Sequence, residues 1–416
     1  MSNNKNLRAV ILITSLFFLW GLASNLNPIL IPHLKKACRL TDFQSALIDS
    51  AFYIAYFVMA LPAGLFMKKY GYKGGIIFGL LLFATGAFLF YPAAETLVYA
   101  FFLGALFIIA CGLAFLETAA NPYITVVGDQ ENATFRLNLA QSFNGAAAFI
   151  APLIGRTFIL SGKNLSGADE AAMSPQELNT YLHTEALSVQ MPYIIIGLIV
   201  LTVAFLVWRT HLPDIIEQED GNRPSGSIWG ETNLLLGVLA QFFYVGAQVC
   251  VSSFFIRFSD KVAGLNEHSS AGFLSVALLG FMIGRFFGTA LMKVMSPAKL
   301  LGIYAVINFF LLLFAVKATG MPAIYALIGV EFFMSIMFPT IFSLSIRGLG
   351  SKTKIGSSLV IMSIVGGAVF PLIMGAVSDR SSIQASYIVP AVCFLVILFF
   401  AFKNFKVKSV KLAASH

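Results

Sequence analysis

The sequence predicts an all-α polytopic membrane protein, in which twelve transmembrane helices form two six-helix bundles. Of its 416 residues, 58% are hydrophobic and 11% are charged, and the mean hydropathy is +0.85. A soluble domain has roughly 25% charged residues. The apolar residues also fall into runs of about 20, the length that a helix needs to cross a bilayer. Composition and run length together argue against a soluble enzyme.

The apolar runs follow one another along the whole chain. Their approximate bounds are 9–34, 43–67, 74–94, 99–125, 136–161, 192–210, 231–257, 269–292, 299–317, 322–346, 355–378 and 384–404. The long loop at about 162–191 contains "SPQELNTYLHTEAL", which we expect to form a surface helix. The long loop at 211–230 is polar and rich in Gly, Pro and acidic residues. It indicates a cytoplasmic linker between an N-terminal bundle, 1–210, and a C-terminal bundle, 231–416.

Lys and Arg predict the orientation, because they concentrate in cytoplasmic loops. With a cytoplasmic N-terminus, seventeen basic residues lie inside and nine outside, while Arg285 lies within a run. We therefore predict a multi-pass protein of a bacterial inner membrane with both termini in the cytoplasm. The net charge of +8 belongs to these loops. No basic strip with interleaved aromatic residues indicates nucleic-acid binding.

The sequences of the two predicted bundles are similar in several segments. "NPYITVVG" at 121–128 resembles "FPTIFSLS" at 338–345, and "NGAAAFIAPLIG" at 144–155 resembles "VGGAVFPLIMG" at 365–375. The near-constant offset indicates a duplicated six-helix unit. Two such halves around a site at the membrane midplane are the plan of a secondary transporter.

Polar side chains recur inside the apolar runs at the spacing of one helix face. Glu117 and Asn121 are four residues apart, and Gln141 and Asn144 are three apart. The first and seventh runs carry similar sets, namely Trp20 and Asn25, and Gln241, Tyr244, Gln248 and Ser252. Such faces usually point to a cavity or to a neighbouring helix. Neutral amides beside aromatic rings suit an uncharged, polyhydroxylated ligand, because each hydroxyl needs donors and acceptors. For any single amide, a role in joining helices is the alternative.

Glu117 is the only charged residue between Glu95 and Asp129. An ionised, unpaired carboxylate costs several kcal/mol in an apolar setting. Glu117 is either a structural acid or a group that gains and loses a proton during transport. We favour the second interpretation, because intramembrane acids in transporters are functional by default. Glu331 and Arg285 also lie within runs, but at different depths, so a simple ion pair between them is not expected.

Several segments, spread over nearly the whole chain, resemble segments of a known family and occur in the same order as in that family. They are "SLFFLWGLASNLNPIL", "SAFYIAYF", "PAGLFMKKYGYKGGI", "GLAFLETAANPY", "RLNLAQSFN", "AQFFYVGAQ", "IGRFFGT" and "MSIMFPTIFSL". They resemble the fucose–galactose–glucose:proton symporter family of the major facilitator superfamily. The resemblance implies the major facilitator fold. It also implies that Glu117 is the proton-linked acid and that Gln141 and Asn144 face the sugar, with Asn25 contributing. The remaining candidate substrate-binding residues are Gln248, Tyr244, Asn121, Trp20 and Phe338.

The chain departs from the family's fucose carriers at informative positions. Pro28 stands where they have a second coupling acid, Phe338 where they have Tyr, and Ser252 where they have Trp. We therefore predict D-glucose or D-galactose as cargo rather than L-fucose. Asp49, on the next run at a similar computed depth, replaces an amide. It is a candidate for the relocated second acid, and a solvated acid at the outer end of its helix is the alternative.

The predicted function is secondary active import of a hexose by proton-coupled symport with alternating access. An uncoupled hexose uniporter and a non-transporting sugar sensor are the alternatives, and Na⁺ in place of the proton stays open. No nucleophile–base set, phosphate loop or cluster of metal ligands in the sequence predicts an enzyme, a cofactor or a metal site. The expected partners are a monosaccharide, a proton and the lipid bilayer, and the expected state is a monomer.

Overall fold

The computed structural model describes residues 2–40, 42–126, 130–158, 173–210, 212, 227–265 and 267–405, and these form helices and their connections. The helices before residue 210 are α1 (Ser2–Ala37), α2 (Asp42–Thr96), α3 (Tyr99–Val126), α4 (Ala133–Phe158), α6 (Pro175–Leu187) and α7 (Gln190–Arg209). Those after it are α8 (Thr232–Ala263), α9 (Glu267–Leu291), α10 (Pro297–Lys317), α11 (Met321–Met334), α12 (Met337–Ile346), α13 (Thr353–Met362), α14 (Gly366–Arg380), α15 (Ile383–Ser386) and α16 (Ile388–Lys403). Short 3-10 segments are η1 (Gln130–Asn132), η2 (Ile228–Gly230), η3 (Gly350–Lys352) and η4 (Ser363–Val365).

All twelve predicted spans fall on these helices. Within the described ranges, nine helical segments are long and apolar enough to cross a membrane. One of them, Ala51–Thr96, contains 46 residues and covers two predicted spans. The rings of Phe66 and Phe78 stack with centroids 4.9 Å apart, whereas twelve residues of straight helix would separate them by about 18 Å. The chain therefore turns back between them, at Gly71, whose φ of 74° suits a residue without a side chain.

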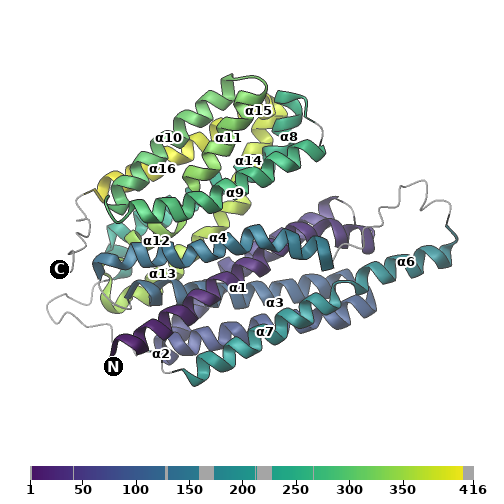
Figure 1. Ribbon diagram of the computed structural model, residues 1–416, viewed down its shortest axis with the longest axis horizontal. Coiled ribbons are helices and arrows are strands. Elements are labelled where there is room, and N and C mark those ends of the chain that lie inside the picture. The colour runs from purple at the N-terminus through teal and green to yellow at the C-terminus, as the bar shows by residue number, and fades with distance from the viewer. Residues whose placement is uncertain are drawn as a thin grey trace.

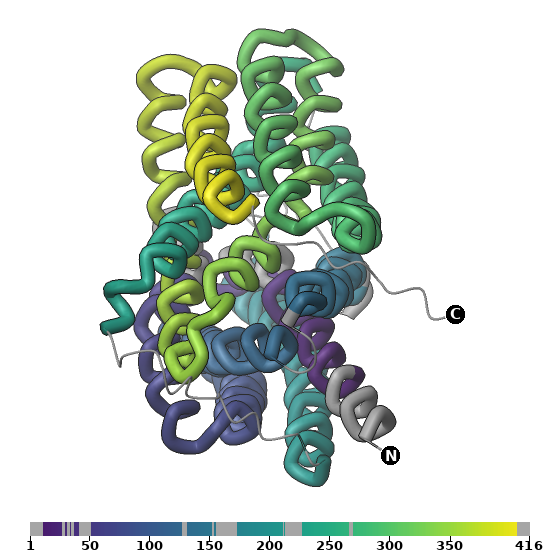
Figure 2. Tube along the Cα trace, turned by 90° about the vertical axis from the view of Figure 1, so that its left-hand side faces the viewer, coloured from purple at the N-terminus to yellow at the C-terminus, as the bar shows by residue number. Residues whose placement is uncertain are grey.

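The helices gather on two sides of the molecule, with α1 to α7 on one side and most of α8 to α16 on the other (Figure 1). The exception is α13, which packs against α2 and α3 and so reaches across to the N-terminal side (Figure 2). Helix α1 begins, and α16 ends, at the same end of the molecule. The predicted linker at 211–230 falls mostly outside the described residues, so the domain boundary there stays a prediction.

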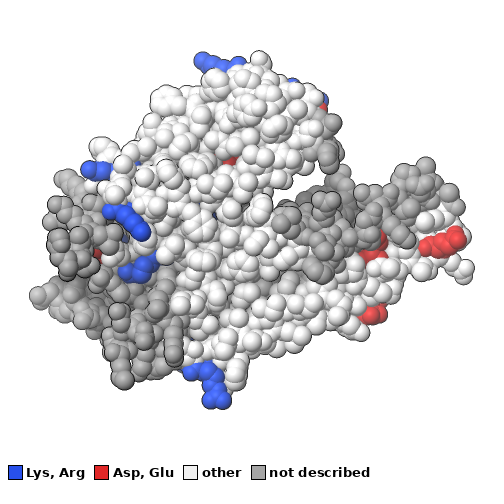
Figure 3. Space-filling model, viewed as in Figure 1, with Lys and Arg blue, Asp and Glu red and all other residues white. Residues whose placement is uncertain are grey.

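Charged side chains mark the two ends of the molecule. Lys and Arg gather at the end where α1 begins, and acidic side chains lie along α6 at the other end (Figure 3). The predicted surface helix in the loop after α4 is confirmed as α6. It begins with a capping box, in which the Ser174 hydroxyl accepts from the Glu177 N–H and the Glu177 carboxylate accepts from the Ser174 N–H.

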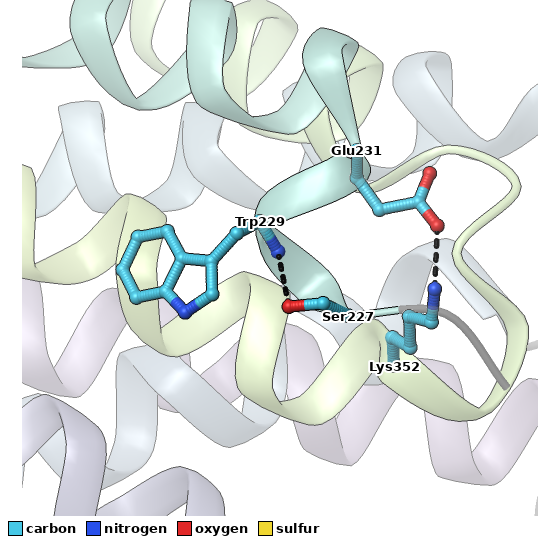
Figure 4. A network of polar contacts seen from close by, with 4 residues as sticks. All are labelled: Ser227, Trp229, Glu231 and Lys352. Atoms are coloured by element: carbon cyan, nitrogen blue, oxygen red, sulfur yellow. Dashed lines mark hydrogen bonds and ion pairs between the residues drawn. The ribbon is translucent and has the colours of Figure 1, made fainter.

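Polar contacts hold the start of α8 at the basic end. The Ser227 hydroxyl accepts from the Trp229 N–H at 3.3 Å, and Lys352 Nζ lies 2.7 Å from Glu231 Oε1 (Figure 4). The Asn233 amide donates to the Leu344 carbonyl at 2.8 Å. The last two contacts join the start of α8 to η3, before α13, and to the end of α12. The Trp229 side chain is exposed, as is usual for an indole at a membrane interface.

Candidate substrate and proton site

Side-chain hydrogen bonds join the two halves along α4, near the basic end. The hydroxyls of Thr134 on α4 and Ser343 on α12 lie 2.9 Å apart. One turn further along α4, the Asn138 amide donates to Thr340 Oγ1 at 3.2 Å. All four side chains are buried. The halves are therefore closed against each other here.

Arg285 continues this contact one turn deeper. Its Nε donates to the Ser335 carbonyl and its Nη1 to the Gln141 carbonyl, both at 2.8 Å. Its guanidinium also lies 4.7 Å from the centre of the Phe281 ring. The side chain is buried, and its donors bind carbonyls from both halves. As the depths of the two residues predicted, no ion pair joins Arg285 to Glu331 in the part of the chain that the structure describes.

A second contact between the halves lies where α13 meets α2 and α3. A Cβ atom placed on Gly64 of α2 would lie 2.0 Å from Ser358 Oγ and 3.0 Å from the Lys354 carbonyl oxygen. The Ser357 hydroxyl donates to the Thr118 carbonyl at 3.2 Å. Here the approach depends on the absence of a side chain at Gly64.

Exposure changes along the polar faces of α4 and α8. On α8, Tyr244 is fully buried, whereas Gln248 and Ser252 are partly exposed. On α4, Gln141 is buried and Asn144 is partly exposed. The partly exposed residues lie toward the end that carries α6 and α15, where the surface is hollowed beside α9 (Figure 3). The interface is thus closed at the basic end and opens toward the opposite end.

The structure brings four predicted amides together in the N-terminal half. The Asn25 amide donates to the Gly21 carbonyl at 2.7 Å. A Cβ atom on Gly21 would lie 2.9 Å from Asn144 Cγ, so Asn25 and Asn144 both adjoin this turn of α1. Nearby on α4, Gln141 Nε2 donates to Asn121 Oδ1 at 3.3 Å. The Asn121 Nδ2 atom is buried and has no hydrogen-bond partner among the described residues.

The remaining predicted substrate residues occupy different surroundings. Phe338 is partly exposed, and its ring centre lies 6.4 Å from that of Tyr244. The Tyr244 hydroxyl donates to the Met334 carbonyl at 3.0 Å. Trp20 is 2% exposed and packs against Phe17, with ring centres 4.2 Å apart. Phe338 is thus more exposed than Trp20.

Glu117 is 8% exposed and accepts a hydrogen bond from Tyr56 Oη at 2.7 Å. Tyr56 was not among the predicted site residues. Its only signal is a phenol in the apolar segment "SAFYIAYF" on the neighbouring span. Asp49, the second predicted coupling acid, lies on α2, but its side chain and that of Pro28 lie outside the described part of the structure.

Residues 12–363 match the model of the family described as Major Facilitator Superfamily. The chain belongs to the Major Facilitator Superfamily. It is 46% identical to an L-fucose-proton symporter of Escherichia coli (strain K12), over 94% of this chain and 91% of the relative. It is 42% identical to a glucose/galactose transporter of Brucella abortus (strain 2308), over 93% of this chain and 92% of the relative.

A solved structure resembles the whole molecule. It is that of a Major Facilitator Superfamily transporter, FucP, in the outward conformation, with a TM-score of 0.88 and 45% identity, covering 95% of this chain and 98% of that one. The predicted major facilitator fold is thereby confirmed, and so is the resemblance to the fucose–galactose–glucose:proton symporter family. The chain is a multi-pass membrane transporter of this superfamily, and membership also confirms the prediction that it is not an enzyme.

Proposed function

We propose that this transporter imports a hexose across a bacterial inner membrane by proton-coupled symport with alternating access, both termini being cytoplasmic. The observation that carries the proposal is a buried acid, Glu117, one helical turn from the Asn121–Gln141 pair beside the open region. With cytoplasmic termini, the closed end is the inner end, so the arrangement faces outward. The relatives named as sugar transporters support this assignment.

In this proposal the amides of Asn25, Asn144 and Gln248 bind sugar hydroxyls, since each amide offers both donors and acceptors. Gln141 and Asn121 line the base of the site, where the unpartnered Asn121 Nδ2 is a free donor. Phe338 and, deeper, Tyr244 and Trp20 supply aromatic faces. The proposed binding set therefore draws on both halves, which links sugar binding to their relative movement.

Glu117 is the proposed proton carrier. Its one hydrogen bond in the described structure comes from a neutral phenol, and an ionised carboxylate in these surroundings is costly without a cation. The acid is therefore neutral while it is buried and loses its proton when it meets water on the inner side. Asp49 is proposed as the second coupling acid of the N-terminal half, in place of the one that Pro28 removes, where it shares a single proton with Glu117.

The proposed cargo is D-glucose or D-galactose in preference to L-fucose. L-Fucose lacks the C6 hydroxyl that both other sugars carry. A site that offers an amide at Gln248 can satisfy an additional sugar hydroxyl, whereas a deoxy sugar leaves such a group unpaired. Competition against labelled D-glucose in counterflow tests this order. Stronger competition by L-fucose, or transport restricted to organic anions, would contradict it.

The test of coupling uses proteoliposomes with and without a pH gradient, and compares wild type with Glu117→Gln. The amide mimics the protonated acid, so sugar exchange should survive while uphill accumulation is lost. Glu95→Gln, which changes an acid at the end of α2, is the matched control and should accumulate sugar normally. Uphill accumulation by Glu117→Gln would show that another group carries the proton.

The second candidate function is uniport of the same sugar, favoured by Pro28 at the position of the missing acid. It predicts that wild type exchanges sugar but never concentrates it, whatever the pH gradient. A wild type that responds to a Na⁺ gradient instead would assign the coupling ion as Na⁺.

A further inference from the structure

A second acid, Glu331 of α11, is buried in the C-terminal half. It is 1% exposed, and Ser252 Oγ on α8 donates to its Oε1 at 2.6 Å. Neither the sugar site nor the Glu117 contact uses this carboxyl group. A buried acid within a membrane span requires a partner or a function.

Charged and titratable groups on the surrounding helices are committed elsewhere or are neutral. Arg285 on α9 binds two backbone carbonyls. Arg257, further along α8, lies over the Phe254 ring, 4.3 Å from its centre. Three phenols are also near, namely Tyr244 on α8, which donates to the Met334 carbonyl, Tyr304 on α10, which packs on Phe333, and Tyr387 before α16, which donates to the Val251 carbonyl. The thiols of Cys250 on α8 and Cys393 on α16 are buried. Among the described residues, no cation pairs with Glu331. An ionised Glu331 would therefore stand without a counter-charge, at a cost of several kcal/mol.

The surroundings of Glu331 parallel those of Glu117. Glu117 lies on the fourth predicted span and Glu331 on the tenth, which are equivalent positions in two six-span halves. Each acid accepts a hydrogen bond from a hydroxyl on a neighbouring helix, from Tyr56 at 2.7 Å and from Ser252 at 2.6 Å. Neither has a cation partner in the described structure. The same physical setting thus occurs once in each half.

Ser252 offers a route between Glu331 and water. It is partly exposed and lies one turn from Gln248, on the side of α8 that borders the open region. Its hydroxyl can accept a proton from a hydronium ion while it passes its own proton to Glu331 Oε1. The hydronium O–H bond breaks as a new serine O–H bond forms, and the old serine O–H bond breaks as the O–H bond of Glu331 forms, so the serine is left unchanged.

We propose that Glu331, reached through Ser252, is a second proton-binding site, so that each sugar enters with two protons, one on each half of the transporter. The inference rests on the proposed symport and adds to it a stoichiometry and a second carrier. Glu331 takes up its proton while the outer side is open and returns it on the inner side, as Glu117 does. Sugar contact is not required of it, because its carboxyl group lies behind Ser252.

The stoichiometry is measurable in the full-length protein. In proteoliposomes with the membrane potential clamped at zero, one pH unit drives about tenfold accumulation for each coupled proton. Two protons predict about a hundredfold steady-state sugar ratio in wild type, and about tenfold in Glu331→Gln. Sugar counterflow should be retained in Glu331→Gln. Glu331→Asp, which keeps a carboxyl group, should accumulate more sugar than Glu331→Gln.

The proton and sugar fluxes can also be measured directly in wild type, so this test does not depend on the folding of a variant. Two protons per sugar support the inference, and one proton per sugar overturns it. Equal accumulation by wild type and Glu331→Gln also overturns it, since Glu331 is then structural. A wild type that exchanges sugar but moves no protons contradicts the proposed symport itself, which distinguishes that failure from failure of the second site.

Ser252 provides an independent variant. Ser252→Ala removes the relay hydroxyl and keeps the acid, so we expect slower proton-driven uptake with unchanged counterflow of sugar at equal pH. Ser252→Thr, which keeps a hydroxyl, is the matched control and should restore the rate. An unchanged rate of proton-driven uptake in Ser252→Ala would overturn the relay.

Discussion

The two contacts that close the basic end differ in kind. Between α4 and α12 the halves meet through paired polar side chains, Thr134 with Ser343 and Asn138 with Thr340. Between α2 and α13 they meet through close packing, in which a Cβ atom on Gly64 would lie 2.0 Å from Ser358 Oγ. The first contact depends on hydrogen bonds and the second on shape.

The difference bears on how a transporter opens and closes. A side-chain hydrogen bond between membrane helices contributes on average about 0.6 kcal/mol, and water can replace its partners when this end opens. Water cannot replace close packing in the same way, and a side chain that overfills such a contact costs about 1–3 kcal/mol. We therefore expect substitutions in the α4 contact to change the ratio of closed to open states by small factors. We expect steric substitutions in the α2–α13 contact to prevent the closed state from forming.

The largest expected effect is that of Gly64→Leu, which inserts a side chain where no Cβ fits. The closed state should lose at least tenfold in population, equivalent to about 1.4 kcal/mol, and sugar uptake should fall accordingly. The measurement is the distance between spin labels on residues 132 and 293, at the basic end of each half. Gly104→Leu is the matched control, because nothing lies within 4 Å of a Cβ at that position. An unchanged label distance in Gly64→Leu would refute the steric account.

Arg285→Met should have the next largest effect. It removes two hydrogen bonds, but it also removes a buried charge that is costly to desolvate, so the net loss is smaller than the sum of the two bonds. Arg285→Lys keeps the charge, but its point-like ammonium does not reproduce the planar fork that reaches Ser335 and Gln141. We expect transport to decrease at least tenfold in the Met variant and less in the Lys variant. Equal rates for Lys and wild type would show that charge alone matters.

A smaller effect is expected for the hydroxyl pair of Thr134 and Ser343. Thr134→Val and Ser343→Ala should each shift the ratio of closed to open states by about threefold, as expected for about 0.6 kcal/mol. The double variant should cost little more than either single one, because both remove the same bond. Fully additive effects on the label distances would mean that the two hydroxyls act separately.

The smallest effect should come from Ser357→Ala, although this residue also bridges the halves. Its hydroxyl has a second acceptor within its own helix segment, the Lys354 carbonyl at 2.9 Å, so its bond to Thr118 adds little to a contact that depends on shape. Transport and label distance should stay within about a factor of two, as for a substitution costing under about 0.5 kcal/mol. A loss as large as that of Gly64→Leu would mean that hydrogen bonding governs this contact too.

Local sequence features determined the helices of this protein. A run of about 20 apolar residues is a membrane span wherever it lies in the chain, and the capping box of Ser174 and Glu177 specifies the start of α6 from four consecutive residues. The spacing of Gln141 and Asn144 likewise places both on one face of α4, because helical periodicity is local. These features needed no knowledge of the neighbouring helices.

Contacts between helices were decided by tertiary structure alone. Sequence singled out Glu117 but not its donor Tyr56, and Glu331 but not its contact with Ser252. The sequence did not indicate that Ser358 of the opposite half packs against Gly64. Such pairings depend on the rotation of each helix about its axis and on the register between two halves that share no continuous helix. Packing of many side chains fixes both quantities at once, and no single stretch of sequence encodes them.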